Sequence, residues 1–283
     1  MFFLKLFSRL PFPILYLFSD FLFLTSYYLI QYRRKVVRKN LRLAFPDMME
    51  SQISQIEKKF YHNLCDYVVE TLKLLTLSPK ELKQRMHFKN PELVNDYARQ
   101  GMSMLFLASH QFNWEWLIAS ANLWLSFPMD YVYQAQRSEF VNQFSLLTRS
   151  RFGSKAIKRA EVAREMIRGK DIIRGVAVVA DQFPGHGHDK RYWTTFLNQD
   201  TAFFEAVNNL AIMTNYPVFF ARIKHLKRGY YEMEFVKIGE PPYEKNSFAV
   251  IENYIKETEK VIHQYPAGWL WSHNRWKKGR NDP

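Results

Sequence analysis

The sequence has almost no cysteine, since Cys65 is its only one in 283 residues. An intrachain disulfide framework is therefore excluded. Cys65 falls in residues 51–75, where apolar side chains recur every three or four positions as in an amphipathic helix. It is typical there of an apolar packing position, and we do not expect it to act as a nucleophile.

The chain also lacks internal repeats and any obvious linker, so nothing in it favours two domains over one large α/β domain. Acidic residues are few, because 27 Asp and Glu stand against 40 Lys and Arg, which gives a net charge of +13. Such a balance favours an acidic partner, which could be phospholipid head groups, nucleic acid or an acidic carrier protein. Charge alone does not choose among them.

Residues 1–32 are apolar and aromatic, and no small-x-small cleavage site follows them, which argues against a secretory signal peptide. The stretch Ile14–Ile30 is close to the ~20 residues needed to cross a bilayer. It runs directly into the basic segment Arg33–Lys39, which favours a retained anchor with the following domain, residues 33–283, on the cytoplasmic side. Asp20 and two prolines leave a helix lying in the membrane interface as the alternative.

A reactive pair is predicted at the end of a central strand. Met104–Ala108 is an apolar run of strand length, and the polar turn Ser109–Asn113 leads into a helical pattern over Trp114–Trp124. His110 in the turn could take a proton from a hydroxyl, with Glu115 fixing its tautomer. The alternative is a histidine that caps a helix and a glutamate that complements the helix dipole.

Two further blocks place polar side chains where they could join this site. Residues 172–180 end in an uncharged run, which predicts a buried strand. The turn after this strand carries Asp181 and Gln182. We expect both side chains to project beside His110, although an Asx turn that only organises the loop is an alternative. A helix over residues 138–152 ends with Arg149 and Arg151, which could bind phosphate or merely complement the dipole.

A third motif suggests different chemistry. His186, His188 and Asp189 have the spacing of metal ligands, which makes a metal-dependent hydrolase an alternative, but no downstream His, Asp or Cys set completes the site. Farther on, the patterns predict a helix over Ala202–Thr214, a hairpin of Pro217–Ile223 with Tyr230–Val236 at the edge of the sheet, and a last helix over Ser247–Gln264. His273 in the tail is a weaker candidate for a second base.

Three blocks together resemble the bacterial lipid A biosynthesis late acyltransferases, the lauroyl and myristoyl transferases. The blocks are His110-Gln-Phe-Asn-Trp-Glu115, Ala180-Asp-Gln-Phe-Pro-Gly185 and Trp269-Leu-Trp-Ser-His-Asn-Arg-Trp276. The resemblance implies an α/β fold of the glycerolipid-acyltransferase type, with a central mixed sheet flanked by helices after the N-terminal anchor. It also implies an acyl-acyl carrier protein donor, a lipid acceptor, no cofactor and no nucleic acid.

The same resemblance suggests a role for each candidate residue. His110 would be the base held by Glu115, Arg149 or, second, Arg151 would contact the donor or a substrate phosphate, and Asp181 and Gln182 would position the acceptor. The enzyme would work at the cytoplasmic face of a bacterial inner membrane. Against this stand the metal-dependent hydrolase and a non-catalytic basic module that binds membranes.

Overall fold

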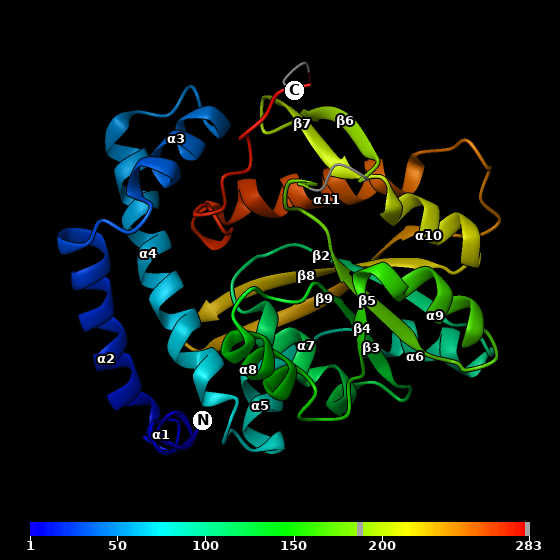
Figure 1. The fold of residues 1–283 in the computed structure, drawn as a ribbon, viewed down its shortest axis with the longest axis horizontal. Helices are drawn as coiled ribbons and strands as arrows, with labels where there is room; N and C mark the ends of the chain where they lie inside the picture. The colour runs from blue at the N-terminus through cyan, green and yellow to red at the C-terminus, as the bar shows by residue number, and fades with distance from the viewer. Residues whose placement is uncertain (186–188, 281–283) are drawn as a thin grey trace.

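A mixed sheet lies at the centre of the molecule, and helices cover both of its faces (Figure 1). The computed structural model describes residues 1–185 and 189–280. The strands are β1 (Met86–Phe88), β2 (Met104–Ala108), β3 (Met129–Tyr133), β4 (Ala156–Lys158), β5 (Gly175–Val179), β6 (Arg191–Phe196), β7 (Gln199–Phe204), β8 (Val218–Lys227) and β9 (Tyr230–Gly239). In the described chain the main sheet has the order β1-β9-β8-β2-β5-β3-β4, with β8 and β9 antiparallel and the other neighbours parallel. The α/β class and the mixed sheet predicted from the sequence are confirmed.

The helices connect the strands and form the outer layers. They are α1 (Phe2–Phe7), α2 (Phe12–Leu24), α3 (Arg34–Ala44), α4 (Glu50–Lys73), α5 (Pro79–Arg85), α6 (Pro91–Arg99), α7 (Trp114–Trp124), α8 (Glu139–Arg149), α9 (Val162–Arg168), α10 (Ala206–Thr214) and α11 (Ala249–Gln264). A π-helical turn η1 (Thr25–Leu29) continues α2, and two 3-10 turns are η2 (Arg159–Glu161) and η3 (Pro266–Gly268). Figure 1 shows α2 at the outer edge, with α4 between it and the sheet.

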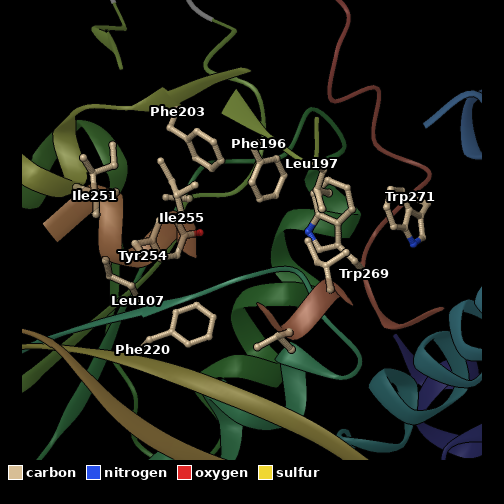
Figure 2. Close-up of a cluster of buried hydrophobic side chains, with 14 of the residues drawn as sticks. Leu107, Phe196, Leu197, Phe203, Phe220, Ile251, Tyr254, Ile255, Trp269 and Trp271 are labelled. Atoms are coloured by element: carbon tan, nitrogen blue, oxygen red, sulfur yellow. The ribbon is translucent and has the colours of Figure 1, made fainter. Parts of the chain in front are cut away.

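The central strand β2 is buried on both faces because its apolar side chains alternate between two cores. Leu105 and Leu107 join the core beneath α11, and Phe106 joins the core on the α7 side. Figure 2 shows Leu107 in the first of these cores, near Tyr254 of α11. This double burial fixes the carboxyl end of β2, from which His110 follows.

Two predictions about elements are wrong. Residues 199–204 form the strand β7 paired with β6 instead of starting a helix, and α10 begins only at Ala206. Leu197 and Asn198, with φ of 48° and 62°, make a two-residue turn whose twist suits an antiparallel hairpin. The β8–β9 hairpin is antiparallel as predicted, but β1 pairs outside β9, so the hairpin does not form the edge. A three-residue strand is too short for its periodicity to be read from sequence.

Candidate active site

The site lies at the carboxyl ends of two neighbouring parallel strands. β2 and β5 pair in a register that sets Ala108 opposite Val179. His110 and Asp181 each follow two residues later, so both leave the sheet at the same level. Open α/β sheets bind their ligands at this edge.

His110 and Asp181 form a close pair. The Nδ1 atom of His110 lies 2.6 Å from Oδ1 of Asp181, and the backbone N–H of His110 donates to Oδ2 of the same carboxylate at 2.9 Å. The carboxylate that is hydrogen-bonded to the imidazole is therefore Asp181, whereas the sequence spacing predicts Glu115 in that place. The two residues stand 71 positions apart in the sequence, and only the pairing of β2 with β5 brings them together.

The contacts of the imidazole determine which nitrogen is available as a base. Because an ionised carboxylate only accepts hydrogen bonds, Nδ1 carries the proton that Asp181 accepts. Nε2 is then the acceptor, and the Nε2 amide of Gln182 lies 3.4 Å from it. The His110 side chain is 18% exposed, so Nε2 is the atom that a substrate hydroxyl could approach.

Asp181 is fully buried but remains ionised. Its Oδ2 also accepts from Nε1 of Trp269 at 2.6 Å. Burial alone would raise the pKa of Asp181, but the charge of His110 and these hydrogen bonds hold it below its ordinary value. A base next to a permanent carboxylate can accept a proton without leaving an isolated buried cation.

Glu115, in the first turn of α7, forms an ion pair with Arg149. Arg149, the last residue of α8, donates from Nε and Nη2 to the two oxygens of Glu115, each at 2.6 Å. Burial alone would raise the pKa of Glu115, but the charge of Arg149 lowers it below its ordinary value. The carboxylate likewise raises the pKa of Arg149, which burial alone would lower. These two parallel hydrogen bonds fix the orientation of the guanidinium and strengthen the ion pair.

Trp114 lies between the two pairs. Its ring stands edge-on to the His110 ring at 5.1 Å between centroids, and its Nε1 donates to Glu115 at 3.1 Å. The ring of Tyr67 stacks on Trp114 from α4, and its hydroxyl donates to Glu115 at 3.3 Å. The His110–Asp181 and Glu115–Arg149 pairs therefore belong to one site.

The loop between β2 and α7 is held from three sides. Asn113 caps α7, with Oδ1 accepting from the Trp116 N–H at 2.9 Å and Nδ2 donating to Glu70 at 2.7 Å. Phe112 has a φ of 47°, and its N–H donates to the carbonyl of Gly268 in η3. A Cβ at Gly268 would come within 2.5 Å of the Phe112 ring, so the close approach requires glycine.

Most backbone amides in this turn already have acceptors. The N–H groups of His110, Gln111 and Phe112 donate to Asp181, Ser109 and Gly268, respectively. These amides are therefore poor candidates for stabilising an oxyanion. Arg149 uses Nε and Nη2 on Glu115, which leaves Nη1 for another acceptor.

The other candidate residues lie apart from this arrangement. Arg151 donates from Nη1 to the carbonyls of Leu74 and Leu77, in the turn after α4. His186 and His188 lie outside the described residues, while Asp189 forms an ion pair with Arg159 at 3.1 Å. Over the described parts of the chain, no three His, Cys, Asp or Glu residues are grouped as metal ligands would be.

The tail contributes a residue that sequence reasoning missed. Trp269 supplies a hydrogen bond to Asp181, and Figure 2 shows its ring beside Phe196. The tail block contributes to the family resemblance, but nothing in its residues indicates a contact with Asp181. His273 accepts a hydrogen bond from the N–H of Phe183 at 3.2 Å, and burial lowers its pKa to about 4, so it is neutral and its Nε2 is engaged.

The comparisons agree with the resemblance carried by the three sequence blocks. The family model described as bacterial lipid A biosynthesis acyltransferase matches residues 1–278, nearly the whole chain. The predicted resemblance is therefore confirmed. A search of the curated proteins gave no match.

Proposed function

Since the chain belongs to the bacterial lipid A biosynthesis acyltransferase family, we propose that it transfers a fatty acyl chain from an acyl carrier protein thioester to a hydroxyl of a lipid A precursor. Family membership makes the chain an acyltransferase with an acyl donor and a lipid acceptor, which contradicts the alternative of a non-catalytic membrane module. The carrier protein, the hydroxyl, the residue roles and the cytoplasmic face of the inner membrane are parts of the proposal.

The pair of His110 and Asp181 is the observation that carries the proposed mechanism. Nε2 of His110 takes the proton of the acceptor hydroxyl as its oxygen attacks the thioester carbonyl. Asp181 holds the proton on Nδ1 and stabilises the imidazolium that forms. A C–O bond forms, the C–S bond breaks, and His110 returns the proton to the departing thiol sulfur.

Arg149 and Glu115 take a different part. Glu115 fixes the guanidinium of Arg149, whose Nη1 can donate to the thioester oxygen as negative charge develops there, or to a phosphate of the substrate. Gln182, whose amide lies 3.4 Å from Nε2 of His110, stands where the acceptor hydroxyl must approach and would help to position it. Arg151, the second candidate for a substrate contact, has backbone partners elsewhere, which favours Arg149.

This mechanism requires no covalent enzyme intermediate. Cys65 is buried, and burial raises the pKa of its thiol, so it is a poor nucleophile. The net charge of +13 suits an acidic carrier protein as donor. The predicted anchor, residues 1–32, would keep the domain at the membrane that holds the acceptor.

The test is transfer of a labelled acyl chain from acyl-acyl carrier protein to extracted membrane lipids, run in the presence of a chelator. We expect label in a lipid with wild type and a loss of about 10²-fold or more with His110→Ala. His87→Ala is the matched control, because His87 is exposed on β1 and should leave transfer unchanged.

Two outcomes would contradict the proposal. Transfer by a folded His110→Ala variant at the wild-type rate would remove the base from the mechanism. Transfer abolished by the chelator and restored by a metal would favour metal chemistry, for which His186, His188 and Asp189 are the sequence candidates. Acyl-coenzyme A run in parallel distinguishes the two classes of thioester donor.

A further inference from the structure

The helix α2 has two apolar faces with different surroundings. Its buried positions recur every three or four residues and face the interior of the protein, at Phe12, Leu15, Ser19 and Phe23. Its exposed positions form a second stripe of large apolar side chains along the other side, at Ile14, Leu17, Phe18, Phe21 and Leu24. An apolar stripe of this length facing solvent marks an interaction surface.

The inner face of α2 packs against the C-terminal half of α4. Near the start of α2, Tyr16 donates to Glu70 at 2.9 Å, and in the middle of α2, Ser19 donates to Asp66 at 2.6 Å. Toward the other end the ring of Phe23 stacks on His62 with centroids 3.5 Å apart. Because these contacts follow α4 backwards, the two helices lie antiparallel and side by side (Figure 1).

This packing makes a spanning orientation of α2 costly. The segment Phe12–Leu29 is long and apolar enough to cross a membrane by length and composition. However, Asp20 lies near its middle and forms an ion pair with Arg228 at 2.6 Å, with these side chains 46% and 38% exposed. If α2 crossed the bilayer, this pair would lie near the bilayer centre, where charged side chains are expensive. The polar helix α4 would have to enter the hydrocarbon as well.

The charges around the stripe fit a negatively charged surface. Lys5 and Arg9 precede α2, and exposed Arg33, Lys35 and Lys39 follow it. Between α1, α2 and Leu72 of α4 lies an apolar groove of about 800 Å³. Basic residues at both ends of an exposed apolar helix are typical of helices that lie in the interface of an anionic membrane.

We propose that the outer stripe of α2, with α1, binds the boundary between head groups and hydrocarbon in one leaflet of an anionic bilayer, and that α2 lies parallel to the membrane surface. Residues 1–32 are then an interfacial part of the folded domain. In this orientation the Asp20–Arg228 pair stays among the head groups, and α4 stays outside the hydrocarbon. The orientation does not depend on the acyl-transfer chemistry proposed above.

Depth measurements along α2 test this orientation directly. Single cysteines at Ile14, Leu17, Phe21 and Leu24, made in a Cys65→Ser background, would each carry a fluorescent or spin label on the full-length protein. The protein is bound to vesicles of phosphatidylethanolamine and phosphatidylglycerol, and depth is read from quenchers placed at known depths. We expect all four labels at one shallow depth, within a few ångströms of each other.

A spanning helix gives a different depth profile. Ile14 and Leu24 are ten residues apart, so a spanning α2 would separate their labels by about 15 Å in depth, and that gradient would overturn the proposal. If adding vesicles does not change the signal of the labels, and the protein has the mass of a dimer, then a second copy of the chain covers the stripe. That result would also overturn the proposal. A label at exposed Lys237 on β9 serves as the control and should remain in water.

Substitutions in the stripe give a second test that does not involve labels. Leu17→Glu with Phe21→Glu should weaken flotation with anionic vesicles at least tenfold, because both side chains are exposed and their loss should not disturb packing. Ile172→Glu is the matched control, since Ile172 is also more than half exposed but lies before β5. Equal loss of binding in the control, or none in the double variant, would contradict the assigned surface.

Discussion

Replacing Asp181 by asparagine should disable His110 while leaving the loop in place. Oδ2 of Asp181 accepts two N–H groups, from the His110 backbone and from Trp269. In Asp181→Asn the amide oxygen must take that position, because an NH₂ group there would face two donors. The NH₂ group then faces Nδ1 of His110 and moves the ring proton to Nε2. The nitrogen that should accept a proton would therefore already carry one.

The expected loss follows from the part that the base plays. General base catalysis contributes about 10²–10⁴-fold, so kcat should fall by that factor, which corresponds to about 3–5 kcal/mol in the activation free energy. The cost in stability should be smaller, about 1–3 kcal/mol, because the two donors at Oδ2 keep an acceptor and mainly the charge is lost. Acyl transfer gives kcat, and thermal unfolding of the same sample gives the stability.

Asp200→Asn is the control, because Asp200 is about half exposed and pairs only at the surface with Arg280. Its kcat should equal that of wild type. The reasoning would be refuted if Asp181→Asn kept kcat within threefold of wild type while a folded Glu115→Gln lost 10²-fold. That result would show that Glu115 holds the imidazole, as the sequence spacing predicts.

Three further substitutions probe other parts of the structure. Gly268→Ala should destabilise the protein by about 1–3 kcal/mol, since its Cβ would overlap the Phe112 ring, and an unchanged melting temperature would contradict that packing. Burial raises the pKa of Glu70 from 4.5 to about 7. As pH rises, the unfolded chain therefore loses this proton at a lower pH than the folded protein does. The free energy of unfolding should fall by about 3 kcal/mol for this reason between about pH 4.5 and pH 7. Glu70→Gln should remove that part of the decline, measured by denaturant unfolding at pH 5 and pH 8, and parallel curves for the two proteins would refute it. Cys65→Ser should keep full kcat in the transfer assay, because the buried thiol takes no part in the reaction.

Local patterns predicted the elements that carry the site. The strand Met104–Ala108, the polar turn and the helix from Trp114 are all found, because an apolar run, a polar turn and helical spacing are signals that act within a few residues. The position of Asp181 beside His110 was also predicted, from strand ends alone. Its hydrogen bond was not, because the order of β2 and β5 in the sheet depends on the packing of the whole chain.

The partner of Glu115 could likewise not be predicted from the local sequence. Glu115 lies in the first helical turn as predicted, but its carboxylate is bound by Arg149, which is 34 residues away in the sequence. No spacing rule links the end of α8 to the start of α7. The resemblance ranks Arg149 before Arg151, but only the packing directs the first toward Glu115 and the second toward the carbonyl of Leu74.

The partners of the two carboxylates determine what each can do. Both oxygens of Glu115 face the fork of Arg149, so this carboxylate is already neutralised and has little free capacity to stabilise an imidazolium. In the described chain no lysine or arginine hydrogen-bonds to Asp181, and the charged group that acts on it most strongly is the ring of His110, so Asp181 gains most when that ring becomes charged. Proton transfer to His110 is therefore coupled to Asp181, whereas charge on a bound substrate is coupled to Arg149. A substitution at Trp269, which holds Asp181 from the tail, should act on the first of these functions alone.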